Sequence, residues 1–372
     1  MNPLRELQKY GQSVWLDYID RRLLVGGELK RLIREDGIRG VTSNPTIFDK
    51  AISGSSDYDE QIEDLLAGHP GATASELYEE LAVADITMAA DILRPVYEET
   101  EGVDGYVSLE ASPYLARDTD GTMVEVRRLR ERVERPNLMV KVPATAEGIP
   151  AIETLIGEGH NINITLMFSI DHYEAVANAY VQGIARASEP AKVASVASFF
   201  VSRVDTKVDK ALEGIGTPEA LSLRGKVAVA NSKLVYARFQ EVLGGDQSSR
   251  LRERGGRCQR VLWGSTGTKN PGYSDVLYVE SLIGADTVNT MPPATIEAFR
   301  DHGRARATLT EACEECEERL AVLKRVGVDL DEITEELQKE GVKAFADSFE
   351  HLLQTIEEKR KALSGSAATP GA

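Results

Sequence analysis

The sequence predicts an α/β protein: a (β/α)8 TIM barrel with extra helices and a C-terminal helical cap. Short apolar segments alternate with segments of helical periodicity along the chain. The apolar segments are almost continuously hydrophobic at their starts, as expected for strands buried on both faces of a parallel sheet. No GxGxxG motif follows the first segment, which argues against the alternative, a doubly wound sheet.

Eight segments are predicted to be strands. In chain order they are 13–17 (SVWLD), 40–44 (GVTSN), 106–110 (YVSLE), 138–142 (LMVKV), 162–168 (INITLMF), 193–200 (VASVASFF), 260–265 (RVLWGS) and 286–290 (DTVNT). Pro45, Pro113 and Pro292 each stand where a strand should end and a helix begin, a position that proline tolerates. Eight strands, each followed by helix, are the pattern of the barrel.

We expect residues 1–363 to form a single barrel domain that includes a helical cap at 306–363. Residues 51–100 carry more helix than one crossover requires. In the cap, an apolar stripe at helical spacing is expected to pack on the barrel or on a partner; it comprises Val342, Phe345, Phe349, Leu352 and Ile356. Residues 364–372 (SGSAATPGA) are predicted to be a disordered tail.

Composition narrows the functional classes. The net charge of −17 over 372 residues argues against a nucleic-acid partner, which requires a basic face. No apolar run has membrane-spanning length, and the start, MNPLRELQKYG, lacks the apolar core of a signal peptide. Three cysteines, an odd and low count, fit a reducing compartment. We therefore expect a cytoplasmic protein without membrane association; a monomer and a homodimer both remain open.

Polar residues stand at or near the predicted strand ends, where active sites of such barrels form. They are Asp17, Asn44, Glu110, Lys141, Thr165, Ser198, Ser265 and Asn289. Lys141 is the most informative, because it interrupts the otherwise apolar strand LMVKVPAT. Burial favours the neutral amine, which is a nucleophile that forms a Schiff base with carbonyl carbon. The alternative is a structural lysine that reaches solvent or pairs with a carboxylate, and Lys141 alone does not separate the two.

Three more residues are candidates for proton transfer, and each has a structural alternative. Glu110 ends the strand before Lys141, so its carboxyl is either an acid and base for carbinolamine chemistry or half of a structural ion pair. Asp17 is either a general base on a substrate hydroxyl or a cap for the following turn. Thr165 could hold a catalytic water, although a strand threonine is usually present for its β-propensity.

A phosphate site would need cations of its own in so acidic a protein. Arg203 follows ASFFVS and Lys269 ends GSTGTK, and with Ser198 and Ser265 they form a plausible clamp. GSTGTK is not a Walker loop, because the GxxxxGK spacing is absent. A surface position is the alternative for either cation, and for Lys269 the spacing alone favours it.

Five motifs resemble those of the transaldolases, in particular the longer bacterial branch of that family. They are GVTSNPTIF (40–48), LMVKVPAT (138–145), NINITLMFS (161–169), SVASFFVSRVD (195–205) and VNTMP (288–292). The resemblance covers nearly the whole chain, and chance agreement of all five motifs in order is not credible.

The resemblance implies a role for each candidate. Lys141 would form the Schiff base, Glu110 would move protons through a water, Thr165 would hold that water, and Asp17 would take the proton of the substrate C4 hydroxyl. The residues implied to bind substrate are Asn44, Asn163 and Ser198 for the hydroxyls and Arg203, Ser265 and Lys269 for the phosphate. The segment VSLEASP departs from a common form that has aspartate in place of Ser112, which puts the local support of Glu110 in doubt.

The implied reaction transfers a dihydroxyacetone unit between sugar phosphates in the non-oxidative pentose phosphate pathway. The donor would be fructose 6-phosphate or sedoheptulose 7-phosphate, and the acceptor glyceraldehyde 3-phosphate or erythrose 4-phosphate. We expect no metal and no organic cofactor, because the imine accepts the electrons.

Two other functions remain open at this point. A related aldolase would release free dihydroxyacetone to water. Relatives of that kind tend to lack the glutamate and to carry a tyrosine near the site, whereas this chain has Glu110 with Phe199 and Phe200. A catalytically silent sugar-phosphate-binding protein is the third hypothesis, and the combination of Lys141, Glu110 and Asp17 argues against it.

Overall fold

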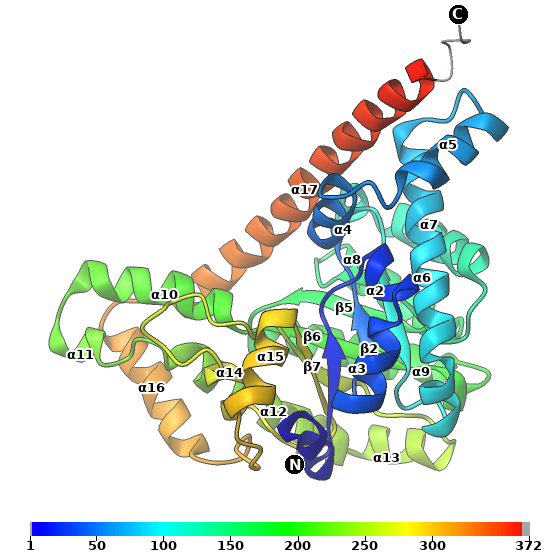
Figure 1. The fold of residues 1–372 in the computed structure, drawn as a ribbon. Coiled ribbons are helices and arrows are strands. Elements are labelled where there is room, and N and C mark those ends of the chain that lie inside the picture. The colour runs from blue at the N-terminus through cyan, green and yellow to red at the C-terminus, as the bar shows by residue number, and fades with distance from the viewer. Residues whose placement is uncertain (1, 367–372) are drawn as a thin grey trace, which may run out of the picture.

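A closed barrel of eight parallel strands forms the centre of the molecule (Figure 1). The computed structural model describes residues 2–366. The strands are β1 (Gln12–Leu16), β2 (Gly40–Thr42), β3 (Tyr106–Glu110), β4 (Leu138–Pro143), β5 (Ile162–Met167), β6 (Ser195–Phe200), β7 (Arg260–Gly264) and β8 (Thr287–Met291). They pair in chain order, and β1 pairs with β8 to close the barrel. The predicted fold class is therefore confirmed.

The predicted strands agree with the observed ones to within two residues at either end. Four predicted ends extend too far, because Asp17, Asn44, Phe168 and Ser265 lie just beyond the last strand positions. Asn44 instead begins the next element: its side chain caps α4, with Pro45 in the first helical position. Polar strand ends of this kind serve the turn as well as the barrel mouth.

Helices surround the barrel and add layers to it (Figure 1). They are α1 (Pro3–Glu6), α2 (Arg21–Val25), α3 (Glu28–Asp36), α4 (Pro45–Ser53), α5 (Asp59–Gly68), α6 (Ala74–Glu99), α7 (Thr119–Val133), α8 (Gly148–Gly157), α9 (Ile170–Arg186), α10 (Ser202–Ile215), α11 (Pro218–Leu221), α12 (Val227–Gly244), α13 (Asp246–Glu253), α14 (Leu277–Ser281), α15 (Pro293–His302), α16 (Cys313–Arg325) and α17 (Leu330–Ser366). Single 3-10 turns are η1 (Leu7–Tyr10), η2 (Pro113–Leu115) and η3 (Pro190–Lys192). The extra helix predicted between 51 and 100 is α5 together with the long α6.

Strand alternation separates the barrel interior from the layer that packs against the helices. On β4, Met139 and Lys141 share one face. Met139 belongs to a buried cluster that also includes Trp15, Tyr106, Ala194, Val196, Leu262 and Val288. This cluster fills the barrel on the amino-terminal side of Lys141, which leaves the carboxyl end as the open one.

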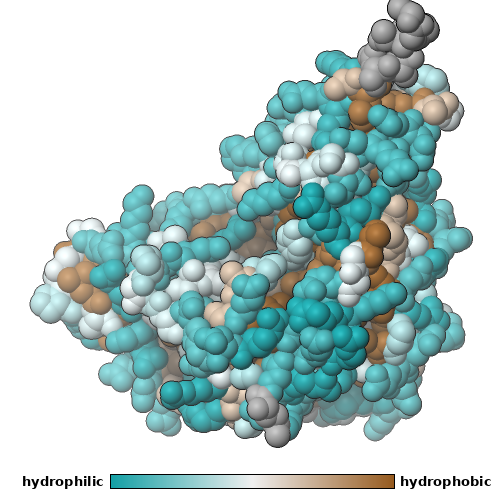
Figure 2. All heavy atoms as spheres, in the orientation of Figure 1, coloured by the Kyte–Doolittle hydropathy of each residue, from teal (hydrophilic) through white to brown (hydrophobic). Residues whose placement is uncertain are grey.

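The C-terminal cap consists of α16 and α17. α17 runs obliquely across the carboxyl end of the barrel, packs against α4, α5, α6 and α10, and projects beyond the barrel beside α5 (Figure 1). The predicted apolar stripe is confirmed: Phe345, Phe349, Leu352 and Ile356 are buried and Val342 is partly buried. Within the described residues, no helix is long and apolar enough to cross a bilayer. Figure 2 shows a largely hydrophilic face that is hollowed beneath α17.

The predicted boundary of the tail needs a correction. α17 continues to Ser366, so residues 364–366 are helical. Glycine in a final turn costs a helix only about 1 kcal/mol, and Pro370 is the first strong helix breaker in this part of the sequence. The rest of the predicted tail, 367–372, lies outside the described residues. The interpretation of 1–363 as a single domain stays a prediction.

Candidate active site

A cavity of about 250 Å³ lies at the carboxyl end of the barrel, beneath α17. Among the residues proposed from the sequence, Glu110 and Asn289 do not line it, and the others do, namely Asp17, Asn44, Lys141, Asn163, Thr165, Ser198, Arg203, Ser265 and Lys269. Seven of the eight strands, or the loops that follow them, thus contribute to one chamber. The structure brings these side chains together, and the chemical roles assigned to them stay predictions.

Lys141 lines this cavity and forms a buried pair with Glu110, which lies behind it and outside the cavity wall. Lys141 Nζ lies 2.9 Å from Glu110 Oε2, and each side chain is 6% exposed. Nζ also donates a hydrogen bond to the carbonyl oxygen of Ser43 at 3.0 Å. Burial raises the pKa of Glu110, and the positive charge of Lys141 counteracts that rise. A carboxyl with a raised pKa beside an amine can both donate and accept a proton.

Asp17 is held on the other side of the cavity by a chain of hydroxyls. The Thr42 hydroxyl donates to Asp17 Oδ1 at 2.6 Å. Because a hydroxyl has one proton, the 2.7 Å contact between Thr290 Oγ1 and Thr42 Oγ1 must have Thr290 as donor. Burial raises the pKa of Asp17, and the Thr42 hydrogen bond and the charges of Lys141, Arg203 and Lys269 oppose the rise.

Thr165 presents a hydroxyl that no protein group binds. Its side chain is buried, it lines the cavity, and Oγ1 has no hydrogen-bond partner among the described residues. Glu110 Oε2 likewise has no hydrogen-bond donor other than the nearby amine of Lys141. Buried polar atoms are normally satisfied, so the free Thr165 hydroxyl indicates room for a water or a substrate hydroxyl in the cavity.

Asn163 and Ser198 form a hydrogen bond with each other that the sequence did not predict. The Ser198 hydroxyl donates to Asn163 Oδ1 at 2.6 Å, and Asn163 Nδ2 donates to Ser108 Oγ at 3.0 Å. The Ser198 proton is thereby used, while Asn163 keeps a second amide hydrogen. Asn44 Oδ1 accepts from the backbone N–H of Ile47 at 3.0 Å, which leaves the Asn44 amide group available at the cavity wall.

Cations without carboxylate partners edge the cavity. Arg203, in the first turn of α10, and Lys269, in the loop after β7, make no ion pair within the described residues. The Arg203 guanidinium stacks 5.2 Å from the ring centre of Phe200. Burial lowers the pKa of Arg203, and the charge of Asp17 opposes that effect. Ser265 lies beside them, 3.0 Å from Ser202 Oγ. Uncompensated positive charge in an acidic protein favours an anionic ligand.

Three of the cavity residues that sequence reasoning did not find bear on the chemistry. Thr42, whose hydroxyl donates a hydrogen bond to Asp17, lies inside the predicted strand GVTSN. A threonine in a strand is explained by its β-propensity alone, so the sequence did not mark it. Lys50, on α4, is a further cation at the cavity that makes no ion pair within the described residues, and no spacing in the sequence marked it. Phe345 was predicted only as packing, yet its ring centre lies 5.8 Å from Lys141 Nζ.

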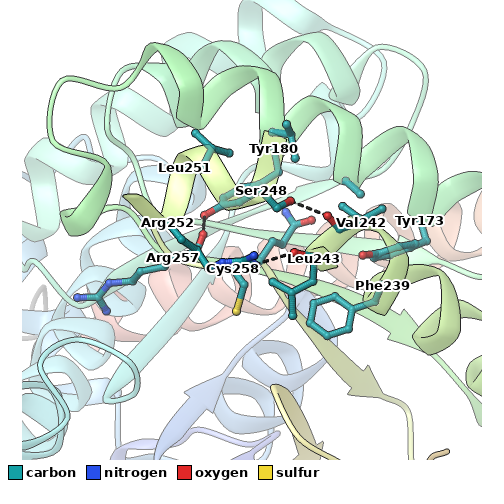
Figure 3. Close-up of a pocket in the computed structure, with 13 residues that line it drawn as sticks. Tyr173, Tyr180, Phe239, Val242, Leu243, Ser248, Leu251, Arg252, Arg257 and Cys258 are labelled. Carbon is teal, nitrogen blue, oxygen red and sulfur yellow. Dashed lines mark hydrogen bonds between the residues drawn. The ribbon is translucent and has the colours of Figure 1, made fainter. Parts of the chain in front are cut away.

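Another, small cavity lies among the helices outside the barrel (Figure 3). It measures about 30 Å³ and is formed by α9, α12, α13 and the segment that enters β7. Apolar and aromatic side chains such as Tyr173, Tyr180 and Phe239 dominate its wall, and burial raises the pKa of the Cys258 thiol there. It lacks the acid, base and cation combination of the larger cavity.

Comparisons with known proteins agree with this geometry. A family described as Transaldolase/Fructose-6-phosphate aldolase matches residues 14–356. A transaldolase of Thiobacillus denitrificans is 48% identical over 360 residues, which cover 96% of this chain and 100% of that protein. Transaldolases of Parafrankia sp. and Thermobifida fusca are 47% and 46% identical, over 99% and 96% of this chain and 99% and 98% of their own lengths. The chain therefore belongs to the transaldolase/fructose-6-phosphate aldolase family.

Proposed function

We propose that this protein is a transaldolase that carries a dihydroxyacetone unit from a ketose phosphate to an aldose phosphate on Lys141. The observation that carries the proposal is the buried Lys141–Glu110 pair, which faces Asp17 across a cavity edged by unpaired cations. The names of the relatives support the same activity. A cytoplasmic location is part of the proposal, and the three free cysteines support it.

Imine formation uses the pair of Lys141 and Glu110. Lys141 Nζ attacks C2 of fructose 6-phosphate or sedoheptulose 7-phosphate and gives a carbinolamine. Glu110 then supplies the proton with which the C2 hydroxyl leaves as water, and it takes a proton back when the imine is hydrolysed. The free hydroxyl of Thr165 would hold that water between them.

Carbon–carbon cleavage uses the opposite wall. Asp17 accepts the proton of the C4 hydroxyl, the C3–C4 bond breaks, and its electron pair moves into the protonated imine to form an enamine. The aldose phosphate leaves with its phosphate held by the cationic edge of Lys50, Arg203 and Lys269. An aldose phosphate such as glyceraldehyde 3-phosphate or erythrose 4-phosphate enters the same place, and the steps run in reverse. This reaction belongs to the non-oxidative pentose phosphate pathway.

Transfer is favoured over release of free dihydroxyacetone by the end of β6. Phe200 lines the cavity, whereas Phe199 packs against Trp263. The strand therefore presents no tyrosine hydroxyl to a water that would protonate the enamine. Together with Glu110, this wall supports retention of the three-carbon unit until an acceptor arrives.

Borohydride trapping tests the proposal. The protein is incubated with fructose 6-phosphate, reduced and digested, and we expect a three-carbon adduct on Lys141 that disappears when erythrose 4-phosphate is added before reduction. Lys141→Met should give no adduct, and Lys50→Met, a matched change on the cavity edge, should retain it. A folded, ketose-binding protein without an adduct would instead be a silent binding protein. Ketose cleavage at the same rate with and without acceptor would identify an aldolase.

A further inference from the structure

The backbone next to Thr165 has an unusual conformation. Leu166 has a φ of 61°, in the left-handed region, which costs a residue with a Cβ about 1–2 kcal/mol. The ladder is irregular at the same point: Ile164 pairs with Ala197 and Met167 with Phe199, so β5 contains one extra residue between these pairs. A bulge of this kind changes the direction of a side chain and recurs next to active sites.

The bulge determines how Thr165 faces the cavity. Thr165 is fully buried, its carbonyl oxygen accepts from the N–H of Ala144 at 2.9 Å, and its hydroxyl lines the chamber without a protein partner. A hydroxyl held by backbone geometry alone depends on whatever maintains that geometry. Strained conformations persist only when the surrounding structure enforces them.

Gln338 on α17 supplies that enforcement. Its Nε2 donates to the carbonyl oxygen of Leu166 at 3.1 Å and to that of Ala144 at 2.9 Å. Both hydrogens of one amide group are therefore used to join the ends of β4 and β5, the strands that carry Lys141 and Thr165. Gln338 does not line the cavity, so it has no direct contact with a ligand there.

The neighbouring turns of α17 fit the same two strand ends. Gly341 is buried, and a Cβ at this position would lie 2.7 Å from Leu166 Cδ2, so a larger residue there would require the Leu166 side chain to shift. One turn before Gln338, Glu335 lies 2.9 Å from His172 Nε2, next to the end of β5. Two turns after Gln338, Phe345 approaches Lys141.

We infer that Gln338 is a positioning residue for the reaction: it fixes the strained Leu166 peptide and thereby aims the Thr165 hydroxyl at the water that Glu110 and Lys141 use. The inference rests on the proposed function, and it assigns a catalytic purpose to the C-terminal cap. Because Gln338 acts on imine formation and hydrolysis and not on ligand contacts, its loss should lower kcat and leave KM nearly unchanged.

A double-mutant cycle between Gln338→Met and Thr165→Val tests this coupling. Methionine preserves the length of the side chain and removes both donors, and valine preserves the shape of threonine and removes the hydroxyl. We expect Gln338→Met to lower kcat by about 10- to 100-fold, as a misplaced catalytic group does, with KM within about threefold. The double variant should be no slower than Thr165→Val alone.

Lys339→Met, on the exposed side of the same turn, is the matched control and should leave kcat unchanged. Gly341→Ala gives a second approach if Gln338→Met folds poorly, because alanine favours the helix while its Cβ displaces Leu166. It should lower kcat in the wild type and not in the Thr165→Val background. Multiplicative losses in either cycle, or a Thr165→Val variant with full kcat, would overturn the inference. If the proposed function itself were wrong, the wild type would show neither turnover nor a Lys141 adduct, which distinguishes that outcome from a failure of the Gln338 inference.

Discussion

Glu110 and Lys141 are register partners on neighbouring strands, and this pairing sets the 2.9 Å distance between Oε2 and Nζ. Side chains directly opposite on adjacent strands share one face, so a glutamate at the end of β3 meets a lysine on β4 without any help from a loop. Burial raises the Glu110 pKa, and Lys141 limits the rise. The carboxyl thus retains its proton to a higher pH than an ordinary glutamate, as a general acid requires.

Glu110→Gln should lower kcat by about 100-fold or more, because general acid–base catalysis commonly contributes 10²–10⁴-fold. KM should change little, since Glu110 does not line the substrate cavity. Steady-state kinetics with fructose 6-phosphate and erythrose 4-phosphate measure both values. Glu98→Gln, on the outside of α6, is the control and should match the wild type. If Glu110→Gln kept the wild-type kcat, the contact between Glu110 and Lys141 would be a structural ion pair without a role in proton transfer.

The Thr42 hydrogen bond should set the acidic limb of the pH profile. Asp17 acts as a base only when ionised, so activity is lost as the pH falls through its raised pKa. The Thr42 hydrogen bond lowers that pKa, so Thr42→Val should move the acidic limb of kcat to higher pH. Thr290→Val, which removes only the donor to Thr42, should move it less in the same direction. If the acidic limb of kcat lies at the same pH in the wild type, Thr42→Val and Thr290→Val, Asp17 does not determine the pH dependence.

Arg203 should contribute to binding through the phosphate. Arg203→Ala is expected to raise KM for fructose 6-phosphate far more than for unphosphorylated donors such as dihydroxyacetone, since only the former carries the anion. The difference should shrink at high salt, because salt weakens the attraction between Arg203 and the phosphate in the wild type. Lys192→Ala, an exposed change, should alter neither KM. Equal effects on both donors would place the phosphate elsewhere.

The fold was predictable because its signals are local. Buried parallel strands are continuously apolar, helices recur at their own spacing, and the polar residues at the barrel mouth stand at consecutive strand ends. Strand ends that converge in space bring Asp17, Lys141 and Thr165 together without any information about side-chain contacts. The barrel topology therefore places polar residues that stand at successive strand ends of the sequence around one cavity.

The parts that were not predictable depend on long-range contacts. Phe345 reaches Lys141, and Gln338 reaches Leu166, only because α17 crosses the barrel mouth at one particular angle. The left-handed conformation of Leu166 has no signature in a leucine. Thr42 was missed for a different reason. A threonine in a strand can serve packing or can orient a carboxylate, and only the 2.6 Å hydrogen bond to Asp17 shows that Thr42 does the second.

Asp205 should make the protein less stable as the pH rises from about 4 to about 7. Burial, the largest cause, and the nearby Asp209 raise the pKa of Asp205 to about 7 from 3.8. Between these values the unfolded chain releases a proton that the folded protein retains, so the free energy of unfolding falls by roughly 4 kcal/mol and then stays constant. Asp205→Asn should reduce this fall in stability, although the raised pKa values of Asp17 and Glu110 act in the same direction, while the exposed Asp64→Asn should leave it unchanged. Urea unfolding at pH 5 and pH 8 measures it, and an unchanged slope in Asp205→Asn would contradict the assignment.

The amino-terminal end of the barrel is closed by a buried ion pair between Arg260 and Asp104. Arg260 Nη2 lies 3.0 Å from Asp104 Oδ1, and the side chains are 10% and 3% exposed. Asp104 also accepts hydrogen bonds from Ser13 Oγ at 2.7 Å and Trp15 Nε1 at 3.1 Å. None of these residues lines the candidate active site, so their contribution should be to stability alone.

Arg260→Met should lower the free energy of unfolding by up to about 3–5 kcal/mol, because it leaves the buried Asp104 carboxylate with only Arg39, 3.9 Å away, as a cation. The double variant Arg260→Met/Asp104→Asn should recover part of this loss, since the uncompensated charge is then gone and an amide still accepts from Ser13 or Trp15. Urea unfolding measures both, and kcat and KM of the folded variants should equal those of the wild type. A stable Arg260→Met protein with reduced kcat would show instead that this end of the barrel influences the reaction.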